Sequence, residues 1–152
     1  MAAAHSNGTI LKYKASSGGS YAAMVCEVVS ITPQPGTVTK SPRGHLGSTN
    51  ALHITEPGAR QPGQMQIQLR CETVTDTQWD EYQAFKGYWL ARTNPLYFQI
   101  NAPKASVDTT APLSEFTGYL ASEPCLTFPE DGTTDWTLDI EITSEITLTD
   151  AA

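Results

Sequence analysis

The stretch WTLDIEITSEITLT, residues 136–149, decides how this chain folds. Its even positions, from Trp136 to Leu148, are apolar except for Ser144, and its odd positions are threonines and acids. Near-strict alternation over fourteen residues predicts a β-strand with one dry face and one wet, acidic face. At about 3.3 Å per residue such a strand spans about 46 Å. Since strands usually have about five or six residues, this one either bends at Ser144 or reaches beyond its own domain.

Shorter segments repeat the same alternation. Residues 64–72 place one apolar set opposite one polar set, and residues 9–14, 21–32, 96–101 and 114–122 are further predicted strands. In the first segment the apolar set is Met65, Ile67, Leu69 and Cys71, and the polar set is Gln64, Gln66, Gln68, Arg70 and Glu72. Glu130-Asp131-Gly132 is a predicted turn before the last strand. The chain is therefore predicted to be mainly β.

One helix is predicted over 76–91, with Thr75, Asp76 or Thr77 as its N-cap. Aromatic residues follow at helical spacings of three, three and four: Trp79, Tyr82, Phe85 and Trp89. Such a stripe can form a ligand platform, but packing of a single helix onto a sheet explains every member without a ligand. We therefore assign the four residues to a core between helix and sheet.

Residues 32–63 differ from the rest of the chain, because they hold five of its ten prolines and five of its eleven glycines. A connection of this length is unusual in a compact domain, and is functional or orders on binding. Lys40, Arg43, His45 and His53 make it the more basic part of an acidic protein. We predict a long extended loop or hairpin arm, able to dock on an acidic surface of another copy.

Length and charge exclude several classes of protein. A chain of 152 residues fits one domain, 1–152. Its net charge is −7, and beyond Lys104 it holds ten acids and no base, which argues against tight binding of nucleic acid. No apolar run is long enough to span a membrane, and the first ten residues do not form a secretory signal, so we expect a soluble chain without membrane insertion.

We find no pattern for catalysis, a metal or a cofactor. The wide spacing of Cys26, Cys71 and Cys125 favours buried free thiols, with a Cys26–Cys71 bridge as the alternative if their strands pair. The three histidines do not impose a metal site. The acids Asp139, Glu141 and Glu145 alternate along one strand, and a solvated sheet face explains them better than a glycosidase site.

The edges of the long amphipathic strand are poorly protected against pairing with another chain, since the strand contains no proline and no lysine. Pairing of such edges between copies, continued around a ring, closes a barrel without edges. The wet face of each copy then lines a bore.

Several segments, taken in order, resemble the tail tube (major tail) proteins of long-tailed, non-contractile bacteriophages. The resemblance covers about residues 8–148, and its most specific parts are HLGSTN, the E-P-G-x-x-x-P-G entry to the glutamine-rich strand and the terminal alternating strand. In chain order the segments are GTILKY, EVVSITPQPG, HLGSTN, ITEPGARQPGQMQIQLR, WDEYQAF, FTGYLAS and DWTLDIEITSEITL. The residues before HLGSTN depart from the more acidic segment expected there.

The resemblance implies a β-sandwich or partial barrel with one flanking helix, six copies of which form a ring with an inner β-barrel. Stacked rings then form a tube for viral DNA, in the virion tail after assembly in the host cytoplasm. Implied partners are further copies, the tape-measure, tail-terminator and baseplate or tail-tip proteins, and double-stranded DNA in transient passage.

Two sets of residues acquire expected roles from this reading. Contacts between rings are assigned to the arm, namely Lys40, Arg43, His45, Leu46 and His53. Arg70 is expected to pair with an acid such as Glu141. The residues expected to line the lumen are Gln64, Gln66, Gln68, Arg70, Thr137, Asp139, Glu141, Thr143 and Glu145.

Other readings remain. A β-sandwich binding module, immunoglobulin-like or carbohydrate-binding, that decorates a virion or an enzyme would use Tyr88, Trp89 and Tyr97 as a contact platform and stay monomeric. A hydrolase would use the acidic strand and show turnover, and the inner tube of a contractile secretion machine would differ mainly in its partners.

Overall fold

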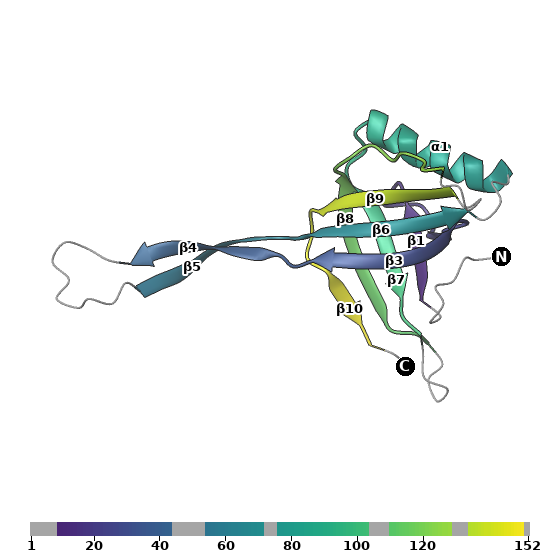
Figure 1. Ribbon diagram of the computed structural model, residues 1–152. Helices are drawn as coiled ribbons and strands as arrows, with labels where there is room; N and C mark the ends of the chain where they lie inside the picture. The colour runs from purple at the N-terminus through teal and green to yellow at the C-terminus, as the bar shows by residue number, and fades with distance from the viewer. Residues whose placement is uncertain (1–8, 44–53, 72–75, 104–109, 129–133, 151–152) are drawn as a thin grey trace.

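The computed structural model describes residues 9–43, 54–71, 76–103, 110–128 and 134–150. Within these residues the chain forms one eight-stranded antiparallel sheet, one two-stranded sheet and one helix (Figure 1). The strands of the large sheet are β1 (Ile10–Lys14), β2 (Ala22–Ala23), β3 (Glu27–Gln34), β6 (Gln64–Cys71), β7 (Leu96–Asn101), β8 (Leu113–Leu120), β9 (Thr134–Ile142) and β10 (Thr147–Thr149). The mainly β sandwich or partial barrel with one helix is confirmed.

The large sheet folds over at β8 into two layers. Its order is β2-β1-β7-β8-β9-β6-β3, and β10 pairs with β8. β8 pairs with β9 only over Gly118–Leu120, while its first residues pair with β10. A Cβ on Gly118 would collide with the Glu141 carbonyl oxygen, so the absence of a side chain permits the close approach of the two strands at this corner.

The core fills the space between the two layers. Alternate residues of β6 and β9 point inward, as the pattern predicts: Met65, Ile67, Leu69, Cys71, Trp136, Leu138, Ile140 and Ile142. Leu11, Leu96, Phe98 and Phe116 face them from the other layer, and the rings of Phe98 and Phe116 stack at 5.5 Å. Burial of this apolar surface is the main stabilising contribution to the fold.

The helix α1 (Asp76–Leu90) covers one open side of the sandwich (Figure 1). Tyr82 and Phe85 are buried, and the ring centroid of Phe85 lies 4.7 Å from that of Tyr13 and 5.8 Å from that of Trp136. Trp79 is 40% exposed, so only part of the predicted stripe enters the core. No helix within the described residues is long and apolar enough to cross a membrane.

The predicted fourteen-residue strand bends, which is one of its two expected outcomes. β9 ends at Ile142, and a bend at Ser144 leads into β10. Thr117 of β8 fixes the bend, because its N–H donates to the Ser144 hydroxyl at 2.9 Å and its carbonyl accepts from Thr143 N at 2.9 Å. The dry face also ends there, since Ile146 and Leu148 are 44% and 74% exposed.

The strand predicted over 21–32 is wrong in its middle. It is divided into β2 and β3 by a bend at Val25 and Cys26, whose backbone N–H groups donate to a carboxylate of the helix instead of a neighbouring strand. The predicted turn at Glu130-Asp131-Gly132 lies outside the described residues.

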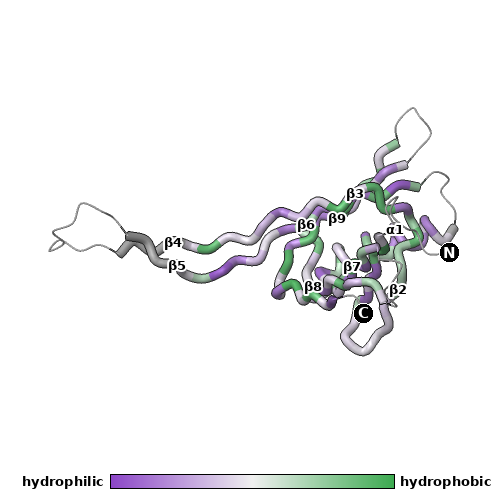
Figure 2. The backbone as a smooth tube through the Cα atoms, turned by 90° about the horizontal axis from the view of Figure 1, so that it is seen from below, coloured by the Kyte–Doolittle hydropathy of each residue, from purple (hydrophilic) through white to green (hydrophobic). Residues whose placement is uncertain are grey.

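The arm is a β-hairpin that continues β3 and β6 away from the body (Figure 1). Its strands β4 (Thr37–Arg43) and β5 (Ile54–Gln61) pair antiparallel, and their residues at 37–39 and 57–61 are exposed. The arm joins the body at Pro35-Gly36 and at Pro62-Gly63. Because neither glycine has a Cβ, the backbones of these two segments can lie in close contact. Figure 2 shows the arm as mostly hydrophilic or neutral, with green concentrated in the body.

Candidate functional site: the polar face of the sheet

The outer face of the layer β9-β6-β3 carries a continuous polar surface. Antiparallel register places Gln64, Gln66, Gln68 and Arg70 of β6 opposite Glu141, Asp139, Thr137 and Asp135 of β9. Because these residues alternate with the buried set, they share the face directed away from the core. β3 widens this polar face with Glu27 opposite Arg70 and Gln34 opposite Gln64.

Side chains on the polar face bind one another. Arg70 donates to Asp135 from Nε at 2.9 Å and from Nη2 at 3.3 Å, a bidentate ion pair. Gln64 Nε2 donates to Glu141 Oε2 at 2.7 Å. Asp139 Oδ2 accepts from the Ser122 hydroxyl at 2.6 Å.

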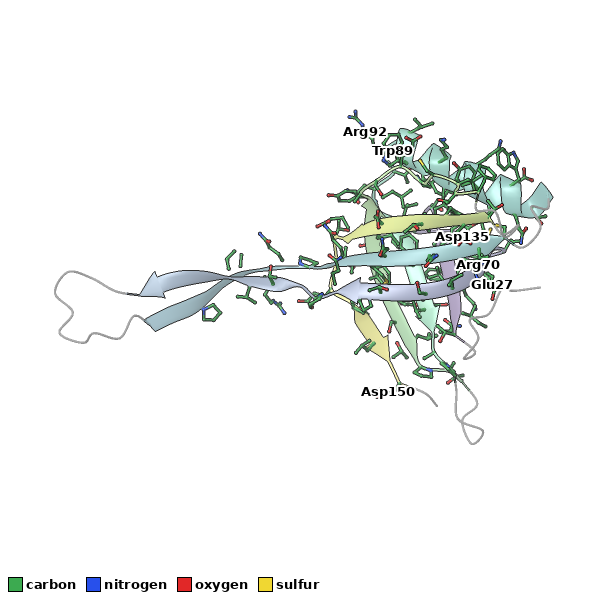
Figure 3. The ribbon with its side chains drawn as sticks, in the orientation of Figure 1. Glu27, Arg70, Trp89, Arg92, Asp135 and Asp150 are labelled. Carbon is green, nitrogen blue, oxygen red and sulfur yellow. The ribbon has the colours of Figure 1, made fainter. Side chains whose placement is uncertain are left out.

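Arg70 therefore pairs with an acid across strands, as predicted, but this acid is Asp135 and not Glu141, the example given. Arg70 lies beside Asp135 at one end of the ladder, whereas Glu141 lies beside Gln64 at the other end. Figure 3 shows Glu27, Arg70 and Asp135 side by side across three strands. The alternation gave the correct face, but only the register determines which acid meets the arginine.

The polar face has a negative formal charge. Arg70 offsets one of its four carboxylates, those of Glu27, Asp135, Asp139 and Glu141, which leaves −3. Acceptor oxygens dominate, since a carboxylate offers no donor when ionised. Such a surface attracts neither phosphates nor other anions.

Two residues of the predicted polar set lie beyond the paired residues of β6 and β9. Thr143 follows the end of β9, and its hydroxyl lies 3.2 Å from that of Thr117. Glu145 lies beyond the bend and pairs at 2.6 Å with Arg60 at the base of the arm. Glu145 is thus separated from Asp139 and Glu141, with which it was grouped by alternation alone.

The arm residues are described only in part. Lys40 and Arg43 lie on β4, in register with Pro57 and Ile54 of β5. His45, Leu46 and His53 lie outside the described residues, as does the HLGSTN segment.

A buried acid that the sequence did not single out joins the helix to the sheet. Glu81 is 4% exposed and accepts from Val25 N at 2.8 Å and from Cys26 N at 3.1 Å. Burial raises the pKa of Glu81 despite these bonds, and burial with the nearby Glu81 raises the pKa of Tyr13 to about 12. In the sequence, an acid between Asp80 and Tyr82 of a helix resembles an ordinary surface residue. Its burial is explained only by the bend before β3, whose N–H groups donate to its carboxylate.

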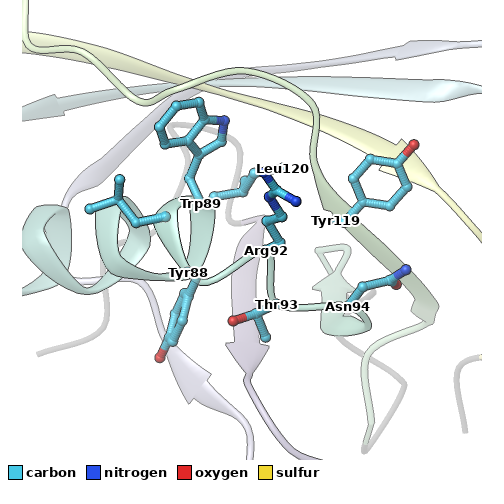
Figure 4. A pocket seen from close by; sticks show the side chains of 8 residues that line it. Tyr88, Trp89, Arg92, Thr93, Asn94, Tyr119 and Leu120 are labelled. Carbon is cyan, nitrogen blue, oxygen red and sulfur yellow. The ribbon is translucent and has the colours of Figure 1, made fainter.

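A pocket of about 540 Å³ lies where the helix ends (Figure 4). Trp89, Arg92 and Tyr119 border it, and Arg92 has a left-handed backbone with φ of 53°. Thr93 N donates to the Tyr88 carbonyl at 3.0 Å, which closes the helix end around Arg92. The pocket is open to solvent and is lined by both polar and apolar residues.

The platform expected for a binding module is not assembled. Tyr88 and Trp89 point to opposite sides of the helix (Figure 4), and Tyr88 packs edge-on against Phe85 at 5.5 Å. Tyr97 lies on β7, with the Lys14 ammonium 5.1 Å from its ring. Among the described residues, no group of three or more His, Cys, Asp or Glu side chains is placed to hold a metal ion.

Comparison with known proteins gives matches in structure alone. No known protein family and no curated protein matches the sequence. A chain of the anti-feeding prophage baseplate, described with 6-fold symmetry, superposes with a TM-score of 0.60 at 7% identity, over 93% of this chain and 92% of that one.

Two further solved structures are similar. The tail of a gene transfer agent particle, refined with C6 symmetry, gives a TM-score of 0.55 at 13% identity, over 92% and 94% of the two chains. The tail tube of SPP1 gives 0.55 at 10% identity, over 93% of this chain and 76% of that one. The chain thus shares its fold with components of phage-like tails, tubes and baseplates, and the likeness does not single out one kind of tail.

Proposed function

We propose that this chain is a structural, non-catalytic subunit of a phage tail tube, in which six copies form a ring and rings stack. The polar face carries the proposal: three amphipathic strands turn an acidic surface outward while their other side completes the core. The fold likeness to components of assemblies with six-fold symmetry supports it. In its most specific form, the proposal is that the tail is of the long, non-contractile type.

Ring formation uses the unpaired edges of the sheet. β3 ends the strand order, so among the described strands its outer edge has no partner. An exposed edge pairs readily with another chain. If successive copies add to one another in a head-to-tail manner, the polar faces join into a closed inner barrel.

The polar face would then line the lumen through which DNA passes. Six copies at −7 each carry −42 per ring. Because proteins hold DNA by releasing counterions to lysine and arginine, a wall whose single arginine is bound to Asp135 gives the phosphates little to bind. Repulsion reaches about 8 Å at physiological salt, so the wall prevents adhesion and does not drive transport.

Electron microscopy of the purified protein over a concentration series tests the assembly. We expect six-fold rings or tubes at high concentration. A protein that stays monomeric at every concentration contradicts the proposal and favours the alternative of a monomeric binding module.

Charge reversal tests the placement of the polar face. Asp139→Lys with Glu141→Lys should leave rings intact and slow DNA ejection, because the lumen gains cations. Asp80→Lys with Asp150→Lys is the matched control, since both acids lie off the polar face and the net charge changes equally. Wild-type ejection kinetics in the first variant would place Asp139 and Glu141 outside the lumen.

The arm is assigned to contacts between rings. Thr37 and Gln61 are register partners, so residues 38–60 can be replaced by Asn-Gly, which closes a two-residue hairpin. The shortened protein should keep the thermal stability of the monomer and lose long tubes. Normal tube growth by this variant would rule out the role of the arm. Tape-measure, terminator and baseplate or tail-tip proteins remain the proposed further partners.

A further inference from the structure

Two buried thiols meet at the end of β3 and β6 that lies away from the arm. Cys26 lies just before β3 and Cys71 is the last residue of β6, and their Sγ atoms are 2.9 Å apart. The adjoining register pair, Glu27 with Arg70, places them directly opposite each other. Cys26 is fully buried, and Cys71 is 3% exposed.

The backbone around these thiols suits a covalent bond. Residues opposite each other in an antiparallel pair have Cα atoms about 4.5 to 5.5 Å apart, which lies within the range that disulfides span. Glu81 accepts from the N–H of Cys26 at 3.1 Å and so fixes the backbone that carries this thiol. Cys125, the third cysteine, is exposed and lies outside the core.

We propose that Cys26 and Cys71 form an intramolecular disulfide once the protein meets an oxidising medium. The bond would close a covalent loop containing β3, the arm and β6, because the two residues are 45 positions apart. In the reducing cytoplasm the thiols stay free. That the protein meets an oxidising medium outside the cell rests on the proposed virion role, whereas the pairing of the two cysteines does not.

The chemistry is thiol–disulfide exchange with a small disulfide as the oxidant. The thiolate of Cys71 attacks one sulfur of the small disulfide, a mixed disulfide forms, and one small thiol leaves. Cys26 loses its proton to solvent and its thiolate attacks the Cys71 sulfur, which releases the second small thiol. One protein disulfide and two small thiols replace two protein thiols and one small disulfide.

Burial makes this exchange slow in the folded protein. Burial raises the pKa of Cys26, so its reactive thiolate is scarce until β3 opens locally. β3 is an outer strand of the described sheet and can open without disrupting the other layer. Oxidation should therefore accelerate in urea below the unfolding transition.

The test uses the unassembled full chain with Cys125→Ser, which removes the exposed thiol. The protein is reduced, freed of reductant, incubated with oxidised glutathione in mild urea, then unfolded and alkylated. We expect loss of both alkylation sites together, a mass lower by two hydrogens, and a linked peptide pair containing Cys26 and Cys71. The midpoint of urea unfolding should rise on oxidation and return after reduction.

Cys26→Ser, in the same Cys125→Ser background, is the matched control and should keep its one alkylation site. Persistence of both sites in the test protein, or a glutathione adduct without the intramolecular link, would overturn the proposal. The measurement needs no tube, so a failed oxidation leaves the assembly proposal intact, and monomeric behaviour in micrographs leaves the disulfide intact.

Discussion

Replacing Glu81 by alanine is expected to destabilise the fold by about 3 kcal/mol. The substitution removes the acceptor of two backbone N–H groups, those of Val25 and Cys26, and the second is buried. Hydrogen bonds to charged groups contribute about 1.5 to 3 kcal/mol, and an orphaned buried donor costs about 1 to 3 kcal/mol. Since both donors belong to the bend between β2 and β3, they cannot find strand partners without rebuilding it. Glu81→Gln keeps one acceptor oxygen and should cost about 1 kcal/mol.

The pH dependence of the stability of the wild type and of Glu81→Gln gives a sharper test. Burial raises the pKa of Glu81 above its ordinary value of 4.5, so the folded state binds this proton more tightly than the unfolded state. The stabilisation from that proton is fully present below pH 4.5 and is lost as pH rises through the folded pKa. The neighbouring groups Tyr13 and Cys26 both have raised pKa values and do not titrate in this range.

Urea unfolding followed by tryptophan fluorescence at neutral pH and near pH 4.5 measures these differences, since Trp136 lies in the core. The advantage of the wild type over Glu81→Gln should grow on acidification. If it shrinks instead, the two N–H bonds stabilise the carboxylate more than burial penalises it, and our account of Glu81 is wrong. An alanine variant as stable as the wild type would refute the role of these bonds altogether.

Further substitutions probe the helix end, the helix packing and the sheet corner. Arg92→Gly should stabilise the fold by about 0.5 to 1 kcal/mol in urea unfolding, because glycine adopts the left-handed conformation without steric cost. Phe85→Ala should cost about 4 kcal/mol, whereas Trp79→Ala, at an exposed position of the same stripe, should cost under about 1 kcal/mol by the same assay. Gly118→Ala should lower the melting temperature measured by circular dichroism, because its Cβ would overlap the Glu141 carbonyl oxygen; an unchanged melting temperature would show that the corner has room.

Periodicity predicted the sheet well where a strand has one buried and one exposed face. In β6, and in β9 from Trp136 onward, the alternation of apolar and polar residues matches burial residue by residue. It continued too far at Ile146 and Leu148, because alternation carries no information about the bend that Thr117 and Ser144 impose. The bond that stops the dry face joins residues 27 positions apart.

Long-range pairing also explains what the candidate site lacked in sequence. From the sequence, several acids could pair with Arg70, and only the register of β6 on β9 selects Asp135. Glu81 gave no signal, because its partners at Val25 and Cys26 are backbone groups that every sequence contains. The Cys26–Cys71 alternative depended openly on strand pairing, and β3 does pair with β6.

The two Pro-Gly crossings at the root of the arm have a consequence for curvature. The chain leaves the body at Pro35-Gly36 and returns at Pro62-Gly63, and the glycines let the two crossings pack closely. The Gly63 carbonyl also accepts from Ile142 N at 3.1 Å, which anchors the junction between arm and body to the end of β9. In the proposed stack of rings joined by such arms, a change of tilt between neighbouring rings would bend the chain at these four residues. We expect a filament built in this way to flex while its bore keeps a constant width.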